Sequence, residues 1–317
     1  MAQTRTHHAE HRITVAAPPG DVYAFVADVS RWPRVFPPTV HAERVDGDGG
    51  DERIRLWATA NDTVKTWTSR RRLDPSAHTV TFRQEVSQPP VAAMGGTWRL
   101  TDAPGGGTLV VLEHDFQAVG DDAAGVSWIT HAVDRNSDAE LAALKAAAES
   151  AATDGELLLS FADTERVSGA AEDVYAFLRD AARWPDRLPH VSALTLQEED
   201  GIQRMEMVTR TADGGEHATY SVRVCLPPGR IVYKQLRTPA LMRVHTGEWT
   251  VRDLGGDECE VISAHVVVLE PANVTTILGP DATIAMARDF VRRALGRNST
   301  ATMRHAKAYA EGCAAHV

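Results

Sequence analysis

The chain has 317 residues, of which 43% are hydrophobic and 24% are charged, and its formal net charge at pH 7 is -10. This composition excludes wholesale disorder, and the acidic balance argues against a general nucleic-acid binder because phosphate contacts need clustered lysine and arginine. The length is that of two domains of about 150 residues each.

The predicted elements of the first half begin with a strand over residues 11–17, which a Pro-Pro-Gly turn follows. A short helix then opens at Gly20-Asp21, Trp32-Pro33 ends it, and a second helical turn runs to about Val40. The strands come next, with the Gly-Gly runs in the turns between them: 41–46, 52–59, 62–73, 78–86, 95–101 and 108–116. A helix rich in alanine, leucine and lysine closes this half over about 123–150.

The second half repeats the first. The segment 21–25 (Asp-Val-Tyr-Ala-Phe) recurs at 173–177, and Arg-Trp-Pro at 31–33 recurs at 183–185, so both share one offset (173 − 21 and 183 − 31). Arg-Asn-Ser at 135–137 recurs only at 297–299, which places about ten extra residues before the last helix of the second copy. A near-constant offset over so many residues indicates a tandem duplication, with a boundary near Asp154.

We therefore predict two domains, 1–153 and 154–317. The second copy should contain a strand over 156–166, a helix over 171–181, strands to about 270 and a helix over about 281–312. One strand, two short helices, a run of antiparallel strands and one long helix make each copy α+β. We expect a curved antiparallel sheet wrapped on the long helix, with a cavity between them.

One strand carries a row of unusual side chains. Because side chains alternate between the two faces of a strand, Trp67, Ser69 and Arg71 share one face with Lys65. The second copy has Thr219, Ser221 and Arg223 in the same register. We expect both rows to line the cavities, where a buried arginine needs a partner, either a structural carboxylate or a ligand oxygen.

Other candidates share the inward face of a strand or the closing helix. His114 recurs as His265; it is either a satisfied core histidine or a group for acid/base chemistry near neutral pH. Asn136 and Asn298 are either surface amides or amides directed into the cavities. The remaining candidates for the walls are aromatic rings and one amide: Trp32, Phe36, Phe82, Gln84, Trp98, Tyr233 and Trp249.

The sequence lacks the common signatures of other chemistry. It has no Gly-rich phosphate loop after a strand, no nucleophile elbow and no His-Glu-x-x-His, so we expect no cofactor. Its three cysteines indicate neither a disulfide framework nor a zinc site, and we interpret Cys225 as structural. Residues 1–12 lack the apolar stretch of a signal peptide, and no run approaches the ~20 apolar residues of a membrane span. We expect a cytoplasmic protein without a membrane or nucleic-acid partner.

The ordered motifs resemble those of the aromatase/cyclases of bacterial type II polyketide synthases, and of their two-domain subclass in particular. The resemblance covers almost the whole chain, and it is the ordered set, present twice, that makes it specific. The motifs that carry it are Trp67-x-Ser69-x-Arg71, Phe82-Arg-Gln-Glu, Met94-Gly-Gly-x-Trp98, His114-Asp-Phe, Ser221-Val-Arg-Val-Cys and His245-x-Gly-Glu-Trp249.

The resemblance implies a START-like helix-grip fold in each half and no cofactor. It also implies a role in antibiotic biosynthesis, with a poly-β-ketone that a minimal polyketide synthase makes on an acyl carrier protein and tethers through phosphopantetheine. The reaction would be regiospecific aldol closure, of C7–C12 type in this subclass, followed by dehydration to an aromatic ring.

Carried onto this chain, the pocket residues of the family fall on Trp67, Ser69 and Arg71, and its entrance pair falls on Trp32 and Phe36. Arginine, which stays protonated, suits oxyanion stabilisation, while Ser69 would orient a carbonyl or water and His114 would move protons. Ser221, Arg223 and His265 are the corresponding catalytic candidates of the second copy. Single-domain relatives have a pocket tyrosine where this chain has Thr39, so its proton donor must come from elsewhere.

Two other interpretations remain. Many helix-grip proteins only bind lipids or other hydrophobic ligands, in which case Arg71 would anchor a ligand. Alternatively, one copy performs the chemistry while the other is a structural or carrier-docking partner, which is consistent with the change from Trp67 to Thr219.

Overall fold

The computed structural model of the chain describes residues 5–48, 50–150, 155–210 and 214–314. By contacts, the chain divides into two compact units, Met1–Asp154 and Gly155–Val317. The boundary that we expected near Asp154, and Gly49 of the expected turn at 47–50, lie outside the described residues. Within the described part of the chain, no helix is long and apolar enough to cross a membrane.

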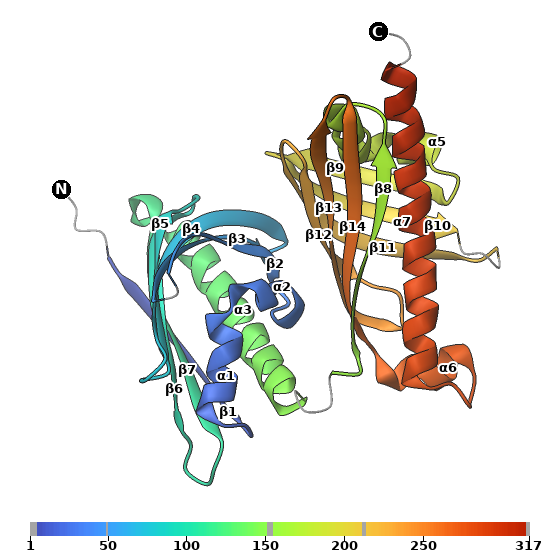
Figure 1. Cartoon of the computed structure of the whole chain (residues 1–317). Coiled ribbons are helices and arrows are strands. Elements are labelled where there is room, and N and C mark those ends of the chain that lie inside the picture. The colour runs from blue at the N-terminus through green and yellow to red at the C-terminus, as the bar shows by residue number, and fades with distance from the viewer. Residues whose placement is uncertain (1–4, 49, 151–154, 211–213, 315–317) are drawn as a thin grey trace. The chain divides into compact units, whose positions relative to one another are not determined.

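The first unit is one antiparallel sheet with short helices and one long helix (Figure 1). The sheet order is β1-β7-β6-β5-β4-β3-β2, so each strand pairs with its neighbour in sequence except β1, which pairs with β7 and leaves the sheet open. The elements are β1 (His7–Val15), α1 (Pro19–Ala27), a 3-10 turn (Val29–Arg31), α2 (Trp32–Val35), β2 (Thr39–Gly47), β3 (Asp51–Ala60), β4 (Thr63–Asp74), β5 (Thr79–Val86), β6 (Val91–Asp102), β7 (Thr108–Ala118), a 3-10 turn (Val119–Asp121) and α3 (Ala123–Ser150).

The second unit has the same order of elements and the sheet order β8-β14-β13-β12-β11-β10-β9. A 3-10 turn (Pro271–Asn273) and α6 (Val274–Leu278) supply the extra residues before the last helix. The other elements are β8 (Leu158–Val167), α4 (Ala171–Arg179), a 3-10 turn (Ala181–Arg183), α5 (Trp184–Arg187), β9 (Val191–Glu199), β10 (Ile202–Arg210), β11 (Glu216–Leu226), β12 (Arg230–Arg237), β13 (Met242–Gly255), β14 (Glu258–Leu269) and α7 (Ile284–Ala314).

The predicted α+β fold, a curved antiparallel sheet with a long helix in each half, is confirmed. The helix expected over 123–150 is α3. Its start is capped by Asp122, whose Oδ2 accepts a hydrogen bond of 2.8 Å from the backbone N–H of Gly125. One face of α3 is buried against the sheet, with Ile129, Val133, Ser137, Leu141 and Leu144 among its buried residues.

The expected ends of the early elements were wrong. The first strand is His7–Val15 rather than 11–17, and α1 ends at Ala27, well before Trp32-Pro33. Pro33 lies in the first turn of α2, where its missing N–H would have no helical acceptor anyway. The helical turn stops at Val35 rather than near Val40, because Pro37-Pro38 follow and β2 begins at Thr39.

One pair of glycines makes room for an aromatic side chain. Gly95 and Gly96 lie inside β6, in the part of it that was expected as the strand 95–101. Gly96 is paired with Phe82 of β5, and the end of the Phe82 ring lies only 2.7 Å from where a Cβ of Gly96 would be. The glycine therefore leaves room for an aromatic ring on the concave face.

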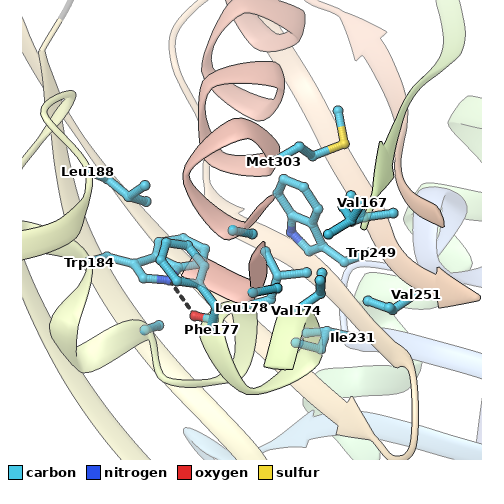
Figure 2. Packing of buried hydrophobic residues seen from close by; sticks show 14 of the residues in the cluster. Val167, Val174, Phe177, Leu178, Trp184, Leu188, Ile231, Trp249, Val251 and Met303 are labelled. Atoms are coloured by element: carbon cyan, nitrogen blue, oxygen red, sulfur yellow. Dashed lines mark hydrogen bonds between the residues drawn. The ribbon is translucent and has the colours of Figure 1, made fainter. Parts of the chain in front are cut away.

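Each unit has an apolar core at one part of the concave face. In the second unit this core joins α4, α7 and the strands, and Figure 2 shows Trp184 and Trp249 packed with Phe177, Leu178 and Met303. The indole N–H of Trp184 donates a 3.3 Å hydrogen bond to the carbonyl of Phe177. The first unit has a matching cluster that includes Val22, Phe36, Trp98, Leu112 and Leu144. The rest of each concave face is left for a cavity.

Candidate active site

The first unit encloses a cavity of about 150 Å³ between its sheet and α3. Its wall is mostly apolar and aromatic, with a few polar groups. Among the residues that line it are Trp32, Phe36, Thr39, Lys65, Trp67, Ser69, Arg71, Phe82, Gln84, Trp98, His114, Trp128, Asn136 and Glu140. A concave apolar pocket with few polar groups is typical of a site for a small hydrophobic molecule.

Arg71 of β4 is buried, with 1% of its surface exposed. Its guanidinium donates to the carbonyls of Val26 (3.3 Å) and Ala27 (2.7 Å) at the end of α1, and its carbon lies 5.1 Å from the ring centre of Trp32. The Nε–H of Arg71 has no hydrogen-bond partner among the described residues. The arginine therefore fixes the end of α1 and keeps a donor unused.

Glu52 of β3 is the carboxylate partner of Arg71. The two residues face each other across the β3–β4 pair, and their closest N–O distance is 3.2 Å with both side chains 1% exposed. Arg44 lies 2.9 Å from the other oxygen of Glu52. Burial lowers the pKa of Arg71 to about 10, which leaves the guanidinium charged at neutral pH.

Ser69 and His114 complete the polar part of this wall. Ser69 is 2% exposed and pairs with Gln84 of β5 in the sheet register. The His114 ring lies 5.5 Å from the Phe82 ring in an edge-on arrangement, and its Nδ1 has no hydrogen-bond partner among the described residues. Burial lowers the pKa of His114 to about 4, so the imidazole is neutral at neutral pH.

The amide of Asn136 on α3 points across to the sheet. Its Nδ2 donates a 2.9 Å hydrogen bond to the carbonyl of Thr59 at the end of β3. The bond uses one amide hydrogen and leaves the oxygen free to accept a hydrogen bond from a bound molecule. Asn136 therefore ties the helix to the sheet as well as lining the cavity.

The second unit contains a smaller cavity of about 110 Å³ with the same arginine arrangement. Arg223 donates to the carbonyl of Leu178 (2.6 Å), and its carbon lies 4.9 Å from the Trp184 ring centre. The residue that corresponds to Glu52 is Gln203, whose amide oxygen accepts a 2.8 Å hydrogen bond from Arg223. The buried guanidinium is thus paired with a carboxylate in the first unit and with a neutral amide in the second.

The second cavity also contains a connected group of polar rings. His265 Nδ1 lies 3.1 Å from the Tyr233 hydroxyl and 3.1 Å from His245 Nε2, and His265 Nε2 lies 3.1 Å from the Ser263 hydroxyl. Burial lowers the pKa of His265 to about 4 and holds that of His245 well below its usual range. Both imidazoles are therefore neutral at neutral pH, and they form a relay of donors and acceptors rather than a charged pair.

All the candidate residues from the sequence lie in these two walls. The first cavity contains the candidates from Trp32 to Asn136 already named. The second is lined by Thr219, Ser221, Arg223, Tyr233, Trp249, His265 and Asn298. Cys225, interpreted as structural, packs in the apolar core.

Other lining residues were not among the candidates from the sequence. Glu140 of α3 lines the first cavity, and His190 and Thr302 line the second; His245 was noted only as part of a motif. Glu140 follows Asn136 by one helical turn, so helical periodicity was a signal that could have identified it. The others come from segments without a distinctive pattern in the sequence.

Gly247 gives the Tyr233 ring its position, and replacing it should disturb this group. The two residues pair across β12 and β13, and a Cβ on Gly247 would overlap the Tyr233 ring and hydroxyl and lie 2.7 Å from the carbonyl of Ala264. We expect Gly247→Ala to lower the free energy of unfolding by about 1–3 kcal/mol, the usual cost of overpacking, as measured by urea denaturation.

Gly312→Ala is the matched control. A Cβ there meets nothing within 4 Å and lies inside α7, so stability should stay the same or rise by about 1 kcal/mol. Equal urea midpoints for Gly247→Ala and the wild type would show that the Tyr233 ring has room to move.

Comparison with known families gives two matches, one in each unit. A family profile described as polyketide cyclase / dehydrase and lipid transport matches residues 6–149. A second profile with the same description matches residues 167–295. The first match covers the whole wall of the first cavity, and the second covers the wall of the second cavity except Asn298, Ser299 and Thr302.

Curated relatives are similar over nearly the full length. The granaticin polyketide synthase bifunctional cyclase/dehydratase of Streptomyces violaceoruber is 48% identical over 303 residues, which are 95% of this chain and 93% of the relative. The actinorhodin polyketide synthase bifunctional cyclase/dehydratase of Streptomyces coelicolor is 46% identical over 98% of this chain and 99% of the relative. Among solved structures, the di-domain ARO/CYC BexL from the BE-7585A biosynthetic pathway is 51% identical with a TM-score of 0.85, covering 96% of this chain and 99% of that one.

Proposed function

This chain belongs to the polyketide cyclase/dehydrase family, and on that basis we propose that it closes and aromatises one ring of a poly-β-ketone carried by an acyl carrier protein. The coarse activity, that of a polyketide aromatase/cyclase and dehydratase, follows from relatives of that name that match the chain from end to end. The C7–C12 position of closure, the thioester-bound substrate and the role of each residue are the further content of the proposal.

The observation that carries the proposal is a buried hydroxyl and guanidinium in an otherwise apolar cavity. Ser69 and Arg71 are adjacent on the inward face of β4, and Ser221 and Arg223 repeat the pair in the second unit. An apolar wall suits a flexible polyketide chain, and two fixed donors suit its reacting oxygen.

The chemistry needs these groups for two developing charges. In the aldol step an enolate carbon attacks a ketone carbon, and the ketone oxygen becomes an alkoxide. Arg71, charged at neutral pH, and the Ser69 hydroxyl would stabilise the enolate and alkoxide oxygens. Neutral His114 would accept the proton removed from the carbon that attacks.

The aromatic residues would set the regiochemistry. Trp32, Phe36 and Trp67 line the same cavity and limit the folded shapes that the chain can adopt. Holding the two reacting carbons together contributes up to several kcal/mol to the rate. The substrate would reach the cavity on the phosphopantetheine arm of an acyl carrier protein that is part of the minimal polyketide synthase.

One observation favours a second candidate, a binding protein without catalysis. Except for Nε, the contacts of Arg71 are made with the protein itself, through two carbonyls and Glu52. In that case the arginine holds the cavity together and a hydrophobic ligand only occupies it.

Reconstitution separates the two candidates. A ketosynthase pair and a carrier protein are incubated with malonyl units, with and without this chain, and the products are identified by mass spectrometry and NMR. We expect the chain to convert a mixture of spontaneously cyclised products into one aromatic product closed between C7 and C12. Tight binding of the polyketide with an unchanged product mixture would support the binding protein instead.

A further inference from the structure

The first cavity contains one carboxyl group that the mechanism above does not use. Glu140 lies on the inner face of α3, four residues after Asn136, and lines the cavity with Val133 and Ser137. Among the described residues of this wall it is the sole acidic side chain. The residue is partly exposed, and it belongs to the cavity wall.

The Glu140 carboxyl group has no partner of its own. Within the described part of the chain it makes no hydrogen bond and no ion pair. Burial alone raises the pKa of Glu140 from its ordinary value of 4.5 to about 8. At neutral pH the residue is therefore a neutral carboxylic acid with a proton available in the cavity.

Other titratable groups of the first unit are paired with residues other than Glu140. Arg71 is held by Glu52, and His11 of β1, a strand that packs on α3, contacts Asp134 on the same helix at 3.1 Å. None of these groups contributes to the pKa of Glu140, for which desolvation is the sole cause. The groups that share the cavity with it are Lys65 and Arg71 of β4 and His114 of β7, and α2 adds Arg34 beside α3.

Among the described residues that line the second cavity there is no counterpart of this acid. The Arg-Asn-Ser repeat aligns Glu140 with Thr302, which also lines its cavity. The Thr302 hydroxyl donates a 3.0 Å hydrogen bond to the carbonyl of Asn298 and lies 3.4 Å from His190 Nε2. An alcohol is far too weak an acid to replace a carboxyl group near neutral pH.

We propose that Glu140 is the general acid of the dehydration step, and that water is therefore lost in the first cavity. The proposal rests on the proposed function, in which the aldol product carries a hydroxyl group β to a ketone. A base, His114 in the mechanism above, takes the proton on the carbon between them, and its C–H electron pair becomes the new C=C bond. The C–O bond breaks with its electrons on oxygen, and the Glu140 proton turns the departing hydroxide into water. Glu140 is left as a carboxylate and His114 as an imidazolium, and one proton passed between them restores both.

The product test uses Glu140→Gln, with Asp138→Asn on the exposed side of the same helix as the control. We expect the Gln variant to accumulate a cyclised product heavier than the wild-type product by one water, with dehydration about 10²–10⁴-fold slower. The Asn control should give the wild-type product at the wild-type rate. A wild-type product from Glu140→Gln, or loss of ring closure along with dehydration, would each overturn the assignment.

The pH dependence of this step is a second readout. In single turnovers, wild-type dehydration should be constant between about pH 5 and pH 8, where His114 is neutral, and fall about tenfold per pH unit above that range, because the acid loses its proton. Glu140→Gln has no such proton, so its residual rate should not show this fall. The same fall in both proteins would assign the titration to another group.

A substrate-free test separates this proposal from the proposed function. A carboxyl group whose pKa is raised by folding destabilises the folded state as pH rises above 4.5, and the effect is complete above about 8. Between pH 5 and 9, wild-type stability should therefore fall relative to Glu140→Gln, on the order of a thousandfold in the unfolding constant. Parallel stability profiles would overturn the neutral acid even where the wild type cyclises polyketides. A failure of the wild type to cyclise would contradict the proposed function alone.

Discussion

The double variant Arg71→Ala/Glu52→Gln should fold and yet form the correctly cyclised product about 10²–10³-fold more slowly than the wild type, the usual effect of removing one oxyanion donor. The Arg71 guanidinium lines the first cavity and forms a buried ion pair with Glu52. The second substitution matters because Arg71→Ala alone would leave the Glu52 carboxylate buried with only Arg44 beside it. Initial rates of product formation with the minimal polyketide synthase would measure the effect.

Arg223→Ala is the matched control for this experiment. It removes the same donor from the second unit, where Gln203 is already neutral and no second change is needed. If the double variant loses rate and Arg223→Ala does not, ring closure takes place in the first cavity. Wild-type rates from the double variant would make Arg71 a structural residue that fixes the end of α1.

The alternation of side chains along β4 predicted most of the residues of this strand that line the cavity, although Thr66, between Lys65 and Trp67, also lines it. Trp67, Ser69 and Arg71 line it, while Arg70 and Arg72 are exposed, as a period of two requires. The repeat strengthened this prediction, because Ser221 and Arg223 occupy the same register in an independent copy.

The partners of these residues could not be predicted in the same way. Glu52 faces Arg71 because of the register between β3 and β4, which depends on the length of the turn that joins them. The carbonyls of Val26 and Ala27 reach the guanidinium only because α1 ends where it does. The sequence contains each of these residues, but tertiary packing decides which of them meet.

The position of Glu140 in the cavity could not be predicted from the sequence either. A helix of 28 residues with many alanines has a weak apolar stripe, so its buried face is uncertain by one or two positions. A glutamate on such a helix is normally on the solvent side. Only the position of α3 against the sheet places this carboxyl group in the cavity, where desolvation raises its pKa.

Glu52→Ala should lower the free energy of unfolding by about 3–5 kcal/mol, because it leaves a buried guanidinium without its carboxylate. Arg71 is 1% exposed, and its remaining contacts are two backbone carbonyls and the Trp32 ring. Chemical denaturation of the isolated protein would measure the change.

Glu52→Gln should cost much less, about 1 kcal/mol, since a single hydrogen bond replaces the ion pair. The second unit already demonstrates the arrangement, because Gln203 accepts a 2.8 Å hydrogen bond from the buried Arg223. Equal losses from the Ala and Gln variants would mean that the carboxylate charge, rather than an acceptor at this position, stabilises Arg71. Each unit has a buried arginine at this position, opposite a carboxylate in the first unit and a neutral amide in the second. The reverse change, Gln203→Glu, therefore tests the same argument in the second cavity.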